Sequence, residues 1–439
     1  MTTSMIIGII GCALSLVLIF ARVWVGPSLM IISIVCIALM KDWGYAMSVL
    51  SPLPYSQMSS YTWACIPLFI LMGCTLSNTG IGQDLYKFAR NMLGTIRGGL
   101  AMATILACSL FSAICGDSVA NAVTMGRVAL PEMKRYHYDE KLAACAVVSG
   151  GTIGIMIPPS VAFIMYAMIT EQSVGKLFAA GMLPGITQAL FYFATIAIIC
   201  RIKPSAGGER VKFSRSEKIK SIGPVWPVAV LFIVMMGGLY GGFFTPVEAG
   251  AFGAVFTFVL ALAMRRITRQ SFFAFIKEGV TSASMVLFLI VGAYFFTRLI
   301  AISGISSALQ DMLIGWQVNY HVPRILVVIV IMSFYLITGA FLDALAVILL
   351  TLGIVFPVIT GLGYDPIWWG VIMVRMLEMC MITPPFGLNL FCVSRTCDVP
   401  IKSMFVGIYP FVIADVVHIA ILVALPELSL WLPRLMGLM

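Results

Sequence analysis

Two segments with consecutive prolines decide how this chain folds. Residues 150–160 read GGTIGIMIPPS, and residues 378–389 read EMCMITPPFGLN. Each proline pair lies inside a long apolar run, where proline removes a backbone donor and clashes with the preceding helical turn. Both segments therefore predict broken helices. Within lipid, the carbonyls freed by a break are tolerated only where they are buried in protein or line a cavity. We expect a site at each break, with a simple packing kink as the alternative.

The composition around these breaks is typical of a membrane protein. Of the 439 residues, 61% are hydrophobic and 10% are charged. Apolar runs long enough to cross a bilayer recur along the chain, which predicts an all-α polytopic membrane protein and excludes a soluble enzyme. The net charge of +9 comes largely from basic residues in short loops. That distribution indicates a positive-inside topology and not a nucleic-acid partner.

The two halves of the chain repeat each other. When the first half is shifted by 226 positions, its paired prolines fall on those of the second half, and four further identities follow. These are Pro131 with Pro357, Pro184 with Pro410, Asp117 with Asp343, and Asp139 with Asp365. A chance alignment of apolar segments would rarely match prolines and intramembrane aspartates without a gap.

The repeat predicts the domain organisation. Residues 1–203 form one repeat with a re-entrant hairpin at about 100–130, and residues 224–439 form a second with a hairpin at about 325–360. Residues 204–223 form a basic cytoplasmic linker between them. Each half holds five spans, and because five is odd the second half is inverted. Inverted repeats are the architecture of secondary transporters, in which sites lie where broken helices meet.

Each predicted hairpin carries an aspartate near its tip, Asp117 in the first and Asp343 in the second. An ionisable group at membrane depth is a functional candidate by default, and the alternative role is to cap a helix. Na⁺ is a hard cation and, by analogy with Ca²⁺ and Mg²⁺, should prefer carboxylate, hydroxyl and carbonyl oxygens. We therefore predict two Na⁺ sites, the first built from Ser112, Gly116, Asp117, Gly154 and Pro158, and the second from Gly339, Asp343, Thr383 and Pro385.

A small anionic substrate is expected between the two ion sites, because helix N-termini favour negative charge. The candidate substrate-binding residues are Ser118, Asn121, Arg127, Ser160 and Asn389. For Arg127, the alternative is that its side chain reaches toward the cytoplasm.

Other polar residues are interpreted structurally. Arg375 and Glu378 are three positions apart and predict an intrahelical ion pair, and Asp415 and His418 are interpreted in the same way. A proton relay through these residues is the alternative. Thr245 is expected to cap the helix that follows it.

Over nearly its whole length the sequence resembles the large membrane subunit of tripartite ATP-independent periplasmic (TRAP) transporters, the DctM-like family. The resemblance is carried by TPVEA at 245–249, residues 151–160, SVGKLF at 173–178 and residues 383–389. It implies an elevator-type, sodium-driven importer of an organic acid such as a C4-dicarboxylate or sialic acid, in the bacterial inner membrane. The first hairpin departs from the family, since Cys115-Gly116-Asp117 stands where Ser-Gly-Ser is common.

The resemblance also implies two partners, a small four-helix membrane subunit that is a separate polypeptide and a periplasmic solute-binding protein. Two other functions fit the sequence. One is a standalone sodium- or proton-coupled carboxylate symporter of related elevator fold, and the other is a channel or membrane scaffold. The sequence holds no phosphate loop, zinc-type spacing or nucleophile–base set. We therefore expect no enzyme activity and no cofactor, with Na⁺ as the coupling ion.

Overall fold

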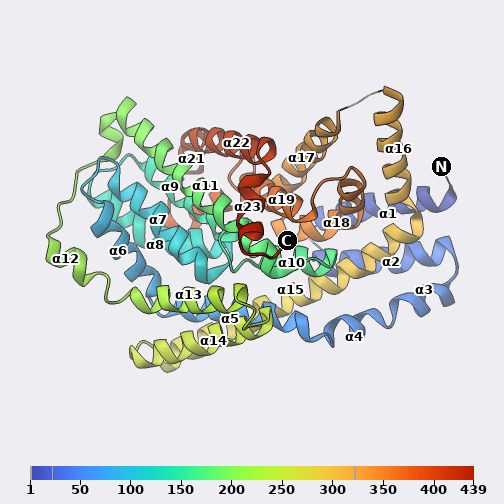
Figure 1. The fold of residues 1–439 in the computed structure, drawn as a ribbon, viewed down its shortest axis with the longest axis horizontal. Coiled ribbons are helices and arrows are strands. Elements are labelled where there is room, and N and C mark those ends of the chain that lie inside the picture. Colours follow the sequence, from blue (N-terminus) through green and yellow to red (C-terminus); the bar gives the residue numbers. More distant parts are fainter. Residues whose placement is uncertain (1, 22, 321–322) are drawn as a thin grey trace.

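The computed structural model describes residues 2–21, 23–320 and 323–439, and these residues contain helices but no strands (Figure 1). Eight helical segments of the described residues are long and apolar enough to cross a membrane, with Tyr61–Asn78 and Glu140–Thr170 each counted as one segment. The number is nine if the bent pair Ile401–Gly407 and Tyr409–Ala424 counts as one span. The prediction of an all-α polytopic membrane protein is confirmed. Three shorter apolar helices, α2 (Val25–Met40), α7 (Gly99–Cys115) and α13 (Trp226–Tyr240), fall below the length of a full span, so the ten-span arrangement stays a prediction.

The helices of residues 2–202 follow one another with short connections. They are α1 (Thr3–Phe20), α2 (Val25–Met40), α3 (Trp43–Leu50), α4 (Leu53–Met58), η1 (Tyr61–Ala64), α5 (Cys65–Asn78), α6 (Ile81–Leu93), α7 (Gly99–Cys115), α8 (Ser118–Arg135), α9 (Glu140–Met156), α10 (Val161–Thr170) and α11 (Val174–Ile202).

Two short elements lie in the linker, η2 (Pro204–Gly207) and α12 (Arg215–Lys220). The remaining helices are α13 (Trp226–Tyr240), α14 (Pro246–Ala263), α15 (Arg269–Ser303), α16 (Ile305–Tyr320), α17 (Arg324–Phe341), α18 (Ala344–Gly361), α19 (Pro366–Cys380), α20 (Leu388–Cys397), α21 (Ile401–Gly407), α22 (Tyr409–Ala424) and α23 (Glu427–Leu435).

The two segments predicted as re-entrant hairpins each form a pair of contacting helices, α7 with α8 and α17 with α18, and their re-entry into the membrane stays a prediction. The turn of each pair ends at an aspartate that caps the second helix. Asp117 accepts a hydrogen bond from the backbone N–H of Ala120 at 2.6 Å, and Asp343 accepts one from Leu345 at 3.1 Å. Capping satisfies free donors of the first helical turn. A carboxylate has two oxygens, so capping is compatible with binding an ion.

Both predicted helix breaks are also present. α9 ends at Met156 and α10 begins after Pro158-Pro159, whereas α19 ends at Cys380 and α20 begins after Pro384-Pro385. The helices that lead into the breaks are the interior of the fold. Every residue of α9 from Leu142 to Met156 is buried, and so is every residue of α19 from Ile367 to Cys380. The surrounding helices thus cover the helices whose backbone the prolines interrupt.

The other helices form two contacting groups. In the first group, α2 packs along α15, and α5 packs against both α14 and α15. In the second group, α7 and α8 pack against α9, and α8 also contacts α20. In Figure 1, α5, α13, α14 and α15 run below the two hairpins. α14 begins with the expected cap, since the N–H of Thr245 donates to Glu248 at 2.7 Å and the N–H of Glu248 donates to Thr245 at 3.3 Å.

The basic linker lies against the ends of α6 and α8. The N–H of Glu209 donates to the carbonyl of Tyr136 at 2.9 Å, and the N–H of Val211 donates to the carbonyl of Gly94 at 3.0 Å. Directly before the linker, the Lys203 ammonium is 2.6 Å from the Asp139 carboxylate. Partial burial raises the pKa of Asp139, but the hydrogen bond and positive charge of Lys203 outweigh that effect, and the net pKa is lowered. The linker is therefore fastened to the first half of the chain.

We expect the close packing of α8 on α9 to be sensitive to volume at Gly151. A Cβ atom at this position would lie 2.4 Å from the Cβ of Ala122. Gly151→Val should therefore lower the free energy of unfolding by roughly 1–3 kcal/mol, the usual penalty for overpacking, measured as a fall in Tm in detergent. Gly237→Val on α13 is the matched control, because a Cβ there meets no heavy atom within 4 Å. Equal Tm values for the two variants would contradict the prediction.

Candidate functional site

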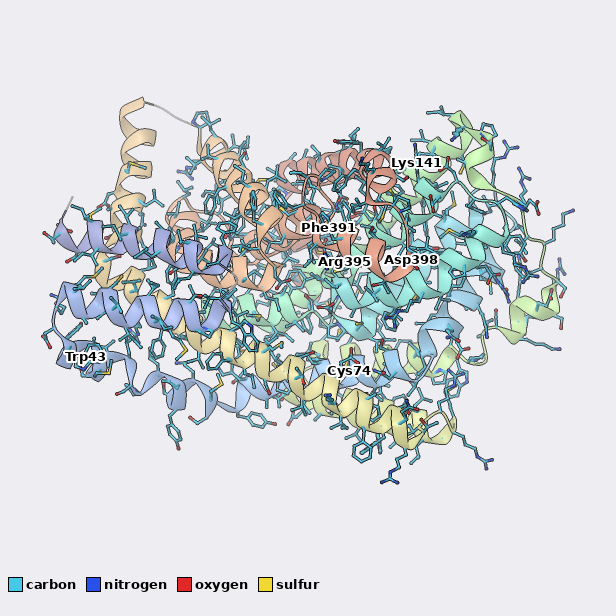
Figure 2. The ribbon with its side chains drawn as sticks, turned by 180° about the vertical axis from the view of Figure 1, so that it is seen from behind. Trp43, Cys74, Lys141, Phe391, Arg395 and Asp398 are labelled. Atoms are coloured by element: carbon cyan, nitrogen blue, oxygen red, sulfur yellow. The ribbon has the colours of Figure 1, made fainter. Side chains whose placement is uncertain are left out.

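A cavity of ≈ 400 Å³ brings the two hairpin tips together. Gly116, Asp117 and Ser118 line it from the first hairpin, and Asp343 lines it from the second. Asp117 and Asp343 are exposed, whereas Ser118 is buried. Four of the residues predicted from sequence therefore share one cavity, although Asp343 lies 225 positions after Ser118. Cys74 of α5, labelled in Figure 2, lies on the same cavity wall as Glu278 of α15.

The helix breaks form another part of the cavity wall. Ile155 comes from the end of α9, and Met381 directly follows α19. Three helices begin at the cavity, because their first residues Ser118, Val161 and Ala344 line it. The N-terminus of a helix carries a partial positive charge. The cavity therefore combines the carboxylates of Asp117, Asp343 and Glu278 with three helix N-termini, and the two aspartates cap the N-termini of α8 and α18.

The backbone segments that form the first predicted ion site pack closely against each other. A Cβ on Gly116 would lie 2.6 Å from the carbonyl oxygen of Pro159, and one on Gly154 would lie 2.8 Å from that of Asp117. The amide nitrogen of Asn121 donates to the Ser112 hydroxyl at 3.0 Å, and among the described residues its buried Oδ1 has no partner. Carbonyl and amide oxygens so placed are the ligand types that a hard cation prefers.

The second predicted ion site is less compact. Gly339 packs closely on the end of α19, since a Cβ there would lie 2.9 Å from the Cβ of Cys380. The Thr383 hydroxyl donates to the carbonyl of Met379 at 2.6 Å. Thr383 and Pro385 do not line the cavity of ≈ 400 Å³. Only Asp343 of this set does.

The five candidate substrate residues separate into three groups. Ser118 lines the cavity, and its hydroxyl accepts a hydrogen bond from the buried Asn389 amide at 2.7 Å. Ser160 caps α10 by accepting from the N–H of Phe163 at 3.3 Å, while Asn121 braces the first hairpin. Arg127 is exposed and does not line the cavity. Of the five, the structure therefore brings only Ser118 into the cavity and places Asn389 directly behind it.

Sequence reasoning missed the contribution of α15. Glu278 and Ser282 line the cavity one helical turn apart, and Glu278 accepts a hydrogen bond from the Asn78 amide at 2.9 Å. The available signal was the four-residue spacing of two polar residues at the edge of an apolar run. Because basic residues precede Glu278, this edge resembled an ordinary charged loop.

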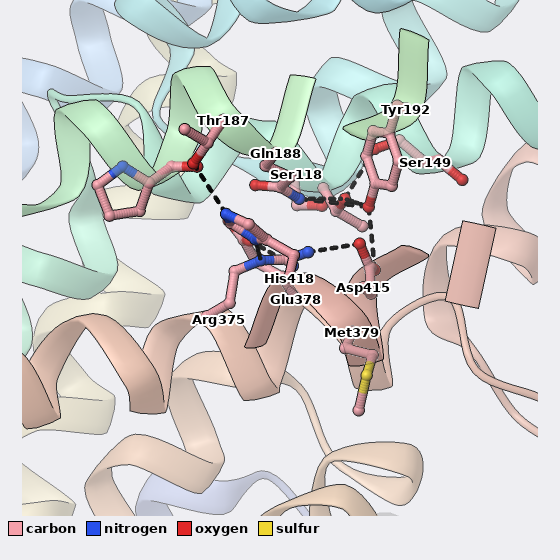
Figure 3. Close-up of polar contacts among 12 residues, drawn as sticks. Ser118, Ser149, Thr187, Gln188, Tyr192, Arg375, Glu378, Met379, Asp415 and His418 are labelled. Atoms are coloured by element: carbon pink, nitrogen blue, oxygen red, sulfur yellow. Dashed lines mark hydrogen bonds and ion pairs between the residues drawn. The ribbon is translucent and has the colours of Figure 1, made fainter. Parts of the chain in front are cut away.

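A second group of polar residues, which we name the buried polar cluster, lies among α9, α11, α19 and α22 (Figure 3). Its centre is Arg375, which donates to Glu378 at 3.1 Å, to the Nδ1 atom of His418 at 3.2 Å, and to Asp415. The cluster also contains Thr152, Thr187, Gln188 and Tyr192. The predicted Arg375–Glu378 pair is confirmed. Asp415 and His418, expected to pair with each other, both bond to Arg375 instead.

The sequence and the fold can be compared with known proteins. Residues 12–428 match the family described as "Tripartite ATP-independent periplasmic transporter, DctM component". The chain is 34% identical over 385 residues to the C4-dicarboxylate TRAP transporter large permease protein DctM of Pseudomonas aeruginosa, covering 88% of this chain and 89% of that protein. It is 28% identical over 419 residues to the sialic acid TRAP transporter large permease protein SiaM of Vibrio cholerae, covering 95% and 96%.

The fold also has a counterpart among solved structures. The crystal structure of the Alcanivorax borkumensis YdaH transporter matches with a TM-score of 0.63 at 12% identity, covering 99% of both chains. At that identity the similarity concerns the fold alone. The resemblance inferred from the sequence motifs is confirmed by the family match, which covers nearly the whole chain. The chain belongs to the DctM component family of tripartite ATP-independent periplasmic transporters, and it is a membrane permease and not an enzyme.

Proposed function

We propose that the chain is the large permease subunit of a sodium-driven importer of a small organic anion, a carboxylate such as a C4-dicarboxylate or a sugar acid. The observation that carries this proposal is the shared cavity, where Asp117 and Asp343 face three helix N-termini. Negative charges at membrane depth are costly unless they are neutralised. An anionic substrate beside the carboxylates of this cavity therefore needs cations, and Na⁺ bound at the hairpin tips would supply them.

We place the first Na⁺ between Asp117 and the α9 break, and the second between Asp343 and the α19 break, with the substrate between them. The unpartnered Oδ1 atoms of Asn121 and Asn389 support this placement, because each is a buried acceptor without a donor among the described residues. Buried acceptors are seldom left unpaired in native proteins. An ion would satisfy Asn121, whereas Asn389 lies behind Ser118 and would hold that hydroxyl toward the substrate.

The inverted repeat and the elevator movement belong to the same proposal. α8 and α18 each contain 18 residues and follow a capping aspartate. α9 and α19 follow Asp139 and Asp365, which also act as caps. These matched elements support two related halves, residues 1–203 and 224–439. We assign α1, α2, α13 and α14 to a static scaffold, and the hairpins and broken helices to the moving part.

The partners follow from the family. The chain would work in the bacterial inner membrane with a small four-helix membrane subunit and a periplasmic solute-binding protein.

Uptake assays distinguish this assignment from the alternatives. Uptake that requires the binding protein supports it, whereas uptake by the chain alone would indicate a standalone symporter. Conductance far above carrier turnover would indicate a channel.

We expect Na⁺ to stabilise the purified protein through the hairpin tips. The Tm should be higher in NaCl than in choline chloride at equal ionic strength. A ligand that binds only the folded state adds about 2.7 kcal/mol at a hundredfold excess over Kd. Asp343→Asn and Asp117→Asn should each reduce that difference, and Asp343→Asn should sharply reduce Na⁺-dependent uptake in the reconstituted complex.

Asp398→Asn provides the control for the sodium experiment. Asp398 is exposed, lies outside the cavity and has a positive φ that Asn tolerates. Its Na⁺ response should equal that of the wild type. Near-normal uptake by Asp343→Asn with unchanged sodium dependence would remove Asp343 from the mechanism.

We also expect the first hairpin and the second break to be energetically coupled. Ser118→Ala and Asn389→Ala each remove the same buried hydrogen bond of 2.7 Å. Their effects on stability should therefore be less than additive by about 0.5–1.5 kcal/mol in a double-mutant cycle. Ser109→Ala, which removes a bond to the carbonyl of Ile105 in its own helix, should be additive with Asn389→Ala. Additivity in both cycles would argue against a single moving unit.

A further inference from the structure

We propose that an acyl chain of a membrane phospholipid fills an apolar cavity between the second hairpin and the helices α1, α15 and α16. The cavity measures ≈ 550 Å³, and it shares no described lining residue with the cavity at the hairpin tips. Its walls come from all five helices, with Leu16 of α1, Phe296 of α15, Leu309 of α16, Val327 of α17 and Val355 of α18. In Figure 1 these helices meet at the end of the molecule that holds α16.

The described lining residues offer no free polar hydrogen to water. Apart from Cys12, whose thiol behaves as a small hydrophobic group, Thr351 is the one polar residue among them. Its hydroxyl donates to the carbonyl of Val347 at 2.7 Å and accepts from the Tyr335 hydroxyl, also at 2.7 Å. A buried water makes about three hydrogen bonds, whereas apolar cavities stay dry and bind hydrocarbon. The chemistry of the walls therefore selects an apolar occupant.

The size of the cavity narrows the choice further. An empty apolar cavity destabilises a fold in proportion to its volume, so a void of ≈ 550 Å³ would be costly. A membrane-spanning helix, about 10 Å wide and about 30 Å long, needs roughly 2,400 Å³, so a helix of another subunit does not fit. The volume is within the range of about 300–1,000 Å³ that is typical of small-molecule pockets. A flexible hydrocarbon chain suits this space.

The cavity opens toward lipid along α17. Four of its lining side chains are exposed, and these are Met312 of α16 and Leu326, Val330 and Phe334 of α17. The exposed fraction of Val330 is 60%. Because α17 is long and apolar enough to cross a membrane, exposed apolar side chains on it are placed in hydrocarbon. A lipid chain can therefore enter sideways from the bilayer without passing through water.

The first half of the chain fills the corresponding space with protein. The helices that precede the two hairpins, α6 and α16, each begin directly after a glycine of positive φ, Gly80 and Gly304. Counted from these glycines, Leu85 of α6 corresponds to Leu309 of α16. Leu85 is 0% exposed, and α6 contacts both helices of the first hairpin. Leu309 instead faces the cavity. At this position in the second half, the packing is completed by something other than the described residues.

A cation at one end of the cavity favours a phospholipid over a neutral hydrocarbon. Arg324 is the first residue of α17 and is exposed, and Leu326 and Val327, two and three positions further on, line the cavity. The guanidinium group matches the geometry of phosphate oxygens. A phospholipid whose chain lies along α17 would therefore place its phosphate at this end of the helix.

A lipid chain at this place would also suit movement of the hairpin, and this consequence rests on the proposed function. α1 was assigned to the static scaffold, whereas α17 and α18 were assigned to the moving part. Lipid tails are as apolar as leucine side chains. A chain between the two parts can therefore be exchanged for side chains as the hairpin moves, with no buried polar bond to break.

The first test detects contact between a lipid chain and the cavity walls. The full chain is placed in nanodiscs of phosphatidylethanolamine and phosphatidylglycerol that include a phosphatidylglycerol with a diazirine in its acyl chain. After irradiation, labelled residues are identified by mass spectrometry. Leu350 and Val355, which are 8% and 6% exposed and line the cavity, should be labelled. Phe111 of the first hairpin, 0% exposed, is the control and should stay unlabelled. Labelling confined to exposed surface side chains would overturn the proposal.

Variants that reduce the cavity provide the second test. Val327→Phe should lower the labelling of Leu350 several-fold, because the larger ring occupies the space of the chain. Val355→Phe tests the same point independently if Val327→Phe fails to fold. Val255→Phe on the exposed face of α14, where Val255 is 63% exposed, is the matched control and should leave the labelling unchanged. Equal labelling in the wild type and in the folded cavity variants would overturn the proposal.

Two further comparisons identify the occupant. A diacylglycerol with the same diazirine chain should label Leu350 less than the phosphatidylglycerol does, and Arg324→Gln should remove that difference. Equal labelling by the two lipids in the wild type would overturn the assignment to a phospholipid. Loss of the labelling when the small membrane subunit is added would show that protein fills the cavity, and it would also overturn the proposal. None of these outcomes depends on sodium or on the transported anion.

Discussion

The fold depends on the requirement that no backbone polar group be left unpaired against lipid. Two proline pairs interrupt helices inside apolar sequence, and the freed carbonyls need either protein or an aqueous cavity around them. The structure meets this requirement by placing α9 and α19 in the interior, with every residue from Leu142 to Met156 and from Ile367 to Cys380 buried. The hairpins pack against these helices, and the cavity opens where the hairpin tips and the breaks meet.

Charge at membrane depth is handled in two distinct ways. Asp117 and Asp343 remain accessible to a cavity, where the proposed Na⁺ would reach them. Arg375 and Asp415 are sealed from solvent and neutralise each other directly. The first arrangement suits reversible binding, because charge can enter and leave with an ion. The second suits a permanent contact between α19 and α22, because breaking a buried ion pair leaves an uncompensated charge.

The sequence predicted the helix breaks, the two hairpins and their acidic tips, because proline and intramembrane aspartate each have strong local consequences. It could not locate partners that depend on tertiary packing. Glu278 lies at the edge of an apolar run and reaches the cavity only because α15 crosses α5. The bond between Asn389 and Ser118 joins residues 271 positions apart. The pairing of Arg375 with Asp415 likewise depends on how α22 packs on α19.

The proposed repeat relates two hairpins that are stabilised differently. Among the described residues, the first hairpin has three buried side-chain hydrogen bonds between its arms: Asn121 to Ser112 at 3.0 Å, Asn121 to the carbonyl of Cys108 at 3.1 Å, and Thr104 to the Met133 sulfur at 3.9 Å. The second has one, between Tyr335 and Thr351 at 2.7 Å. The bond between Asn121 and Ser112 is about one helical turn from the first tip, whereas the bond between Tyr335 and Thr351 is about two turns from the second. Ser160 caps the first break and is 0% exposed, but its counterpart Phe386 is 42% exposed. The first tip is therefore held by side chains as well as backbone, while the second tip depends mainly on the Asp343 cap. Related backbones with different side chains thus give one closely packed wall of the cavity and one more loosely held wall.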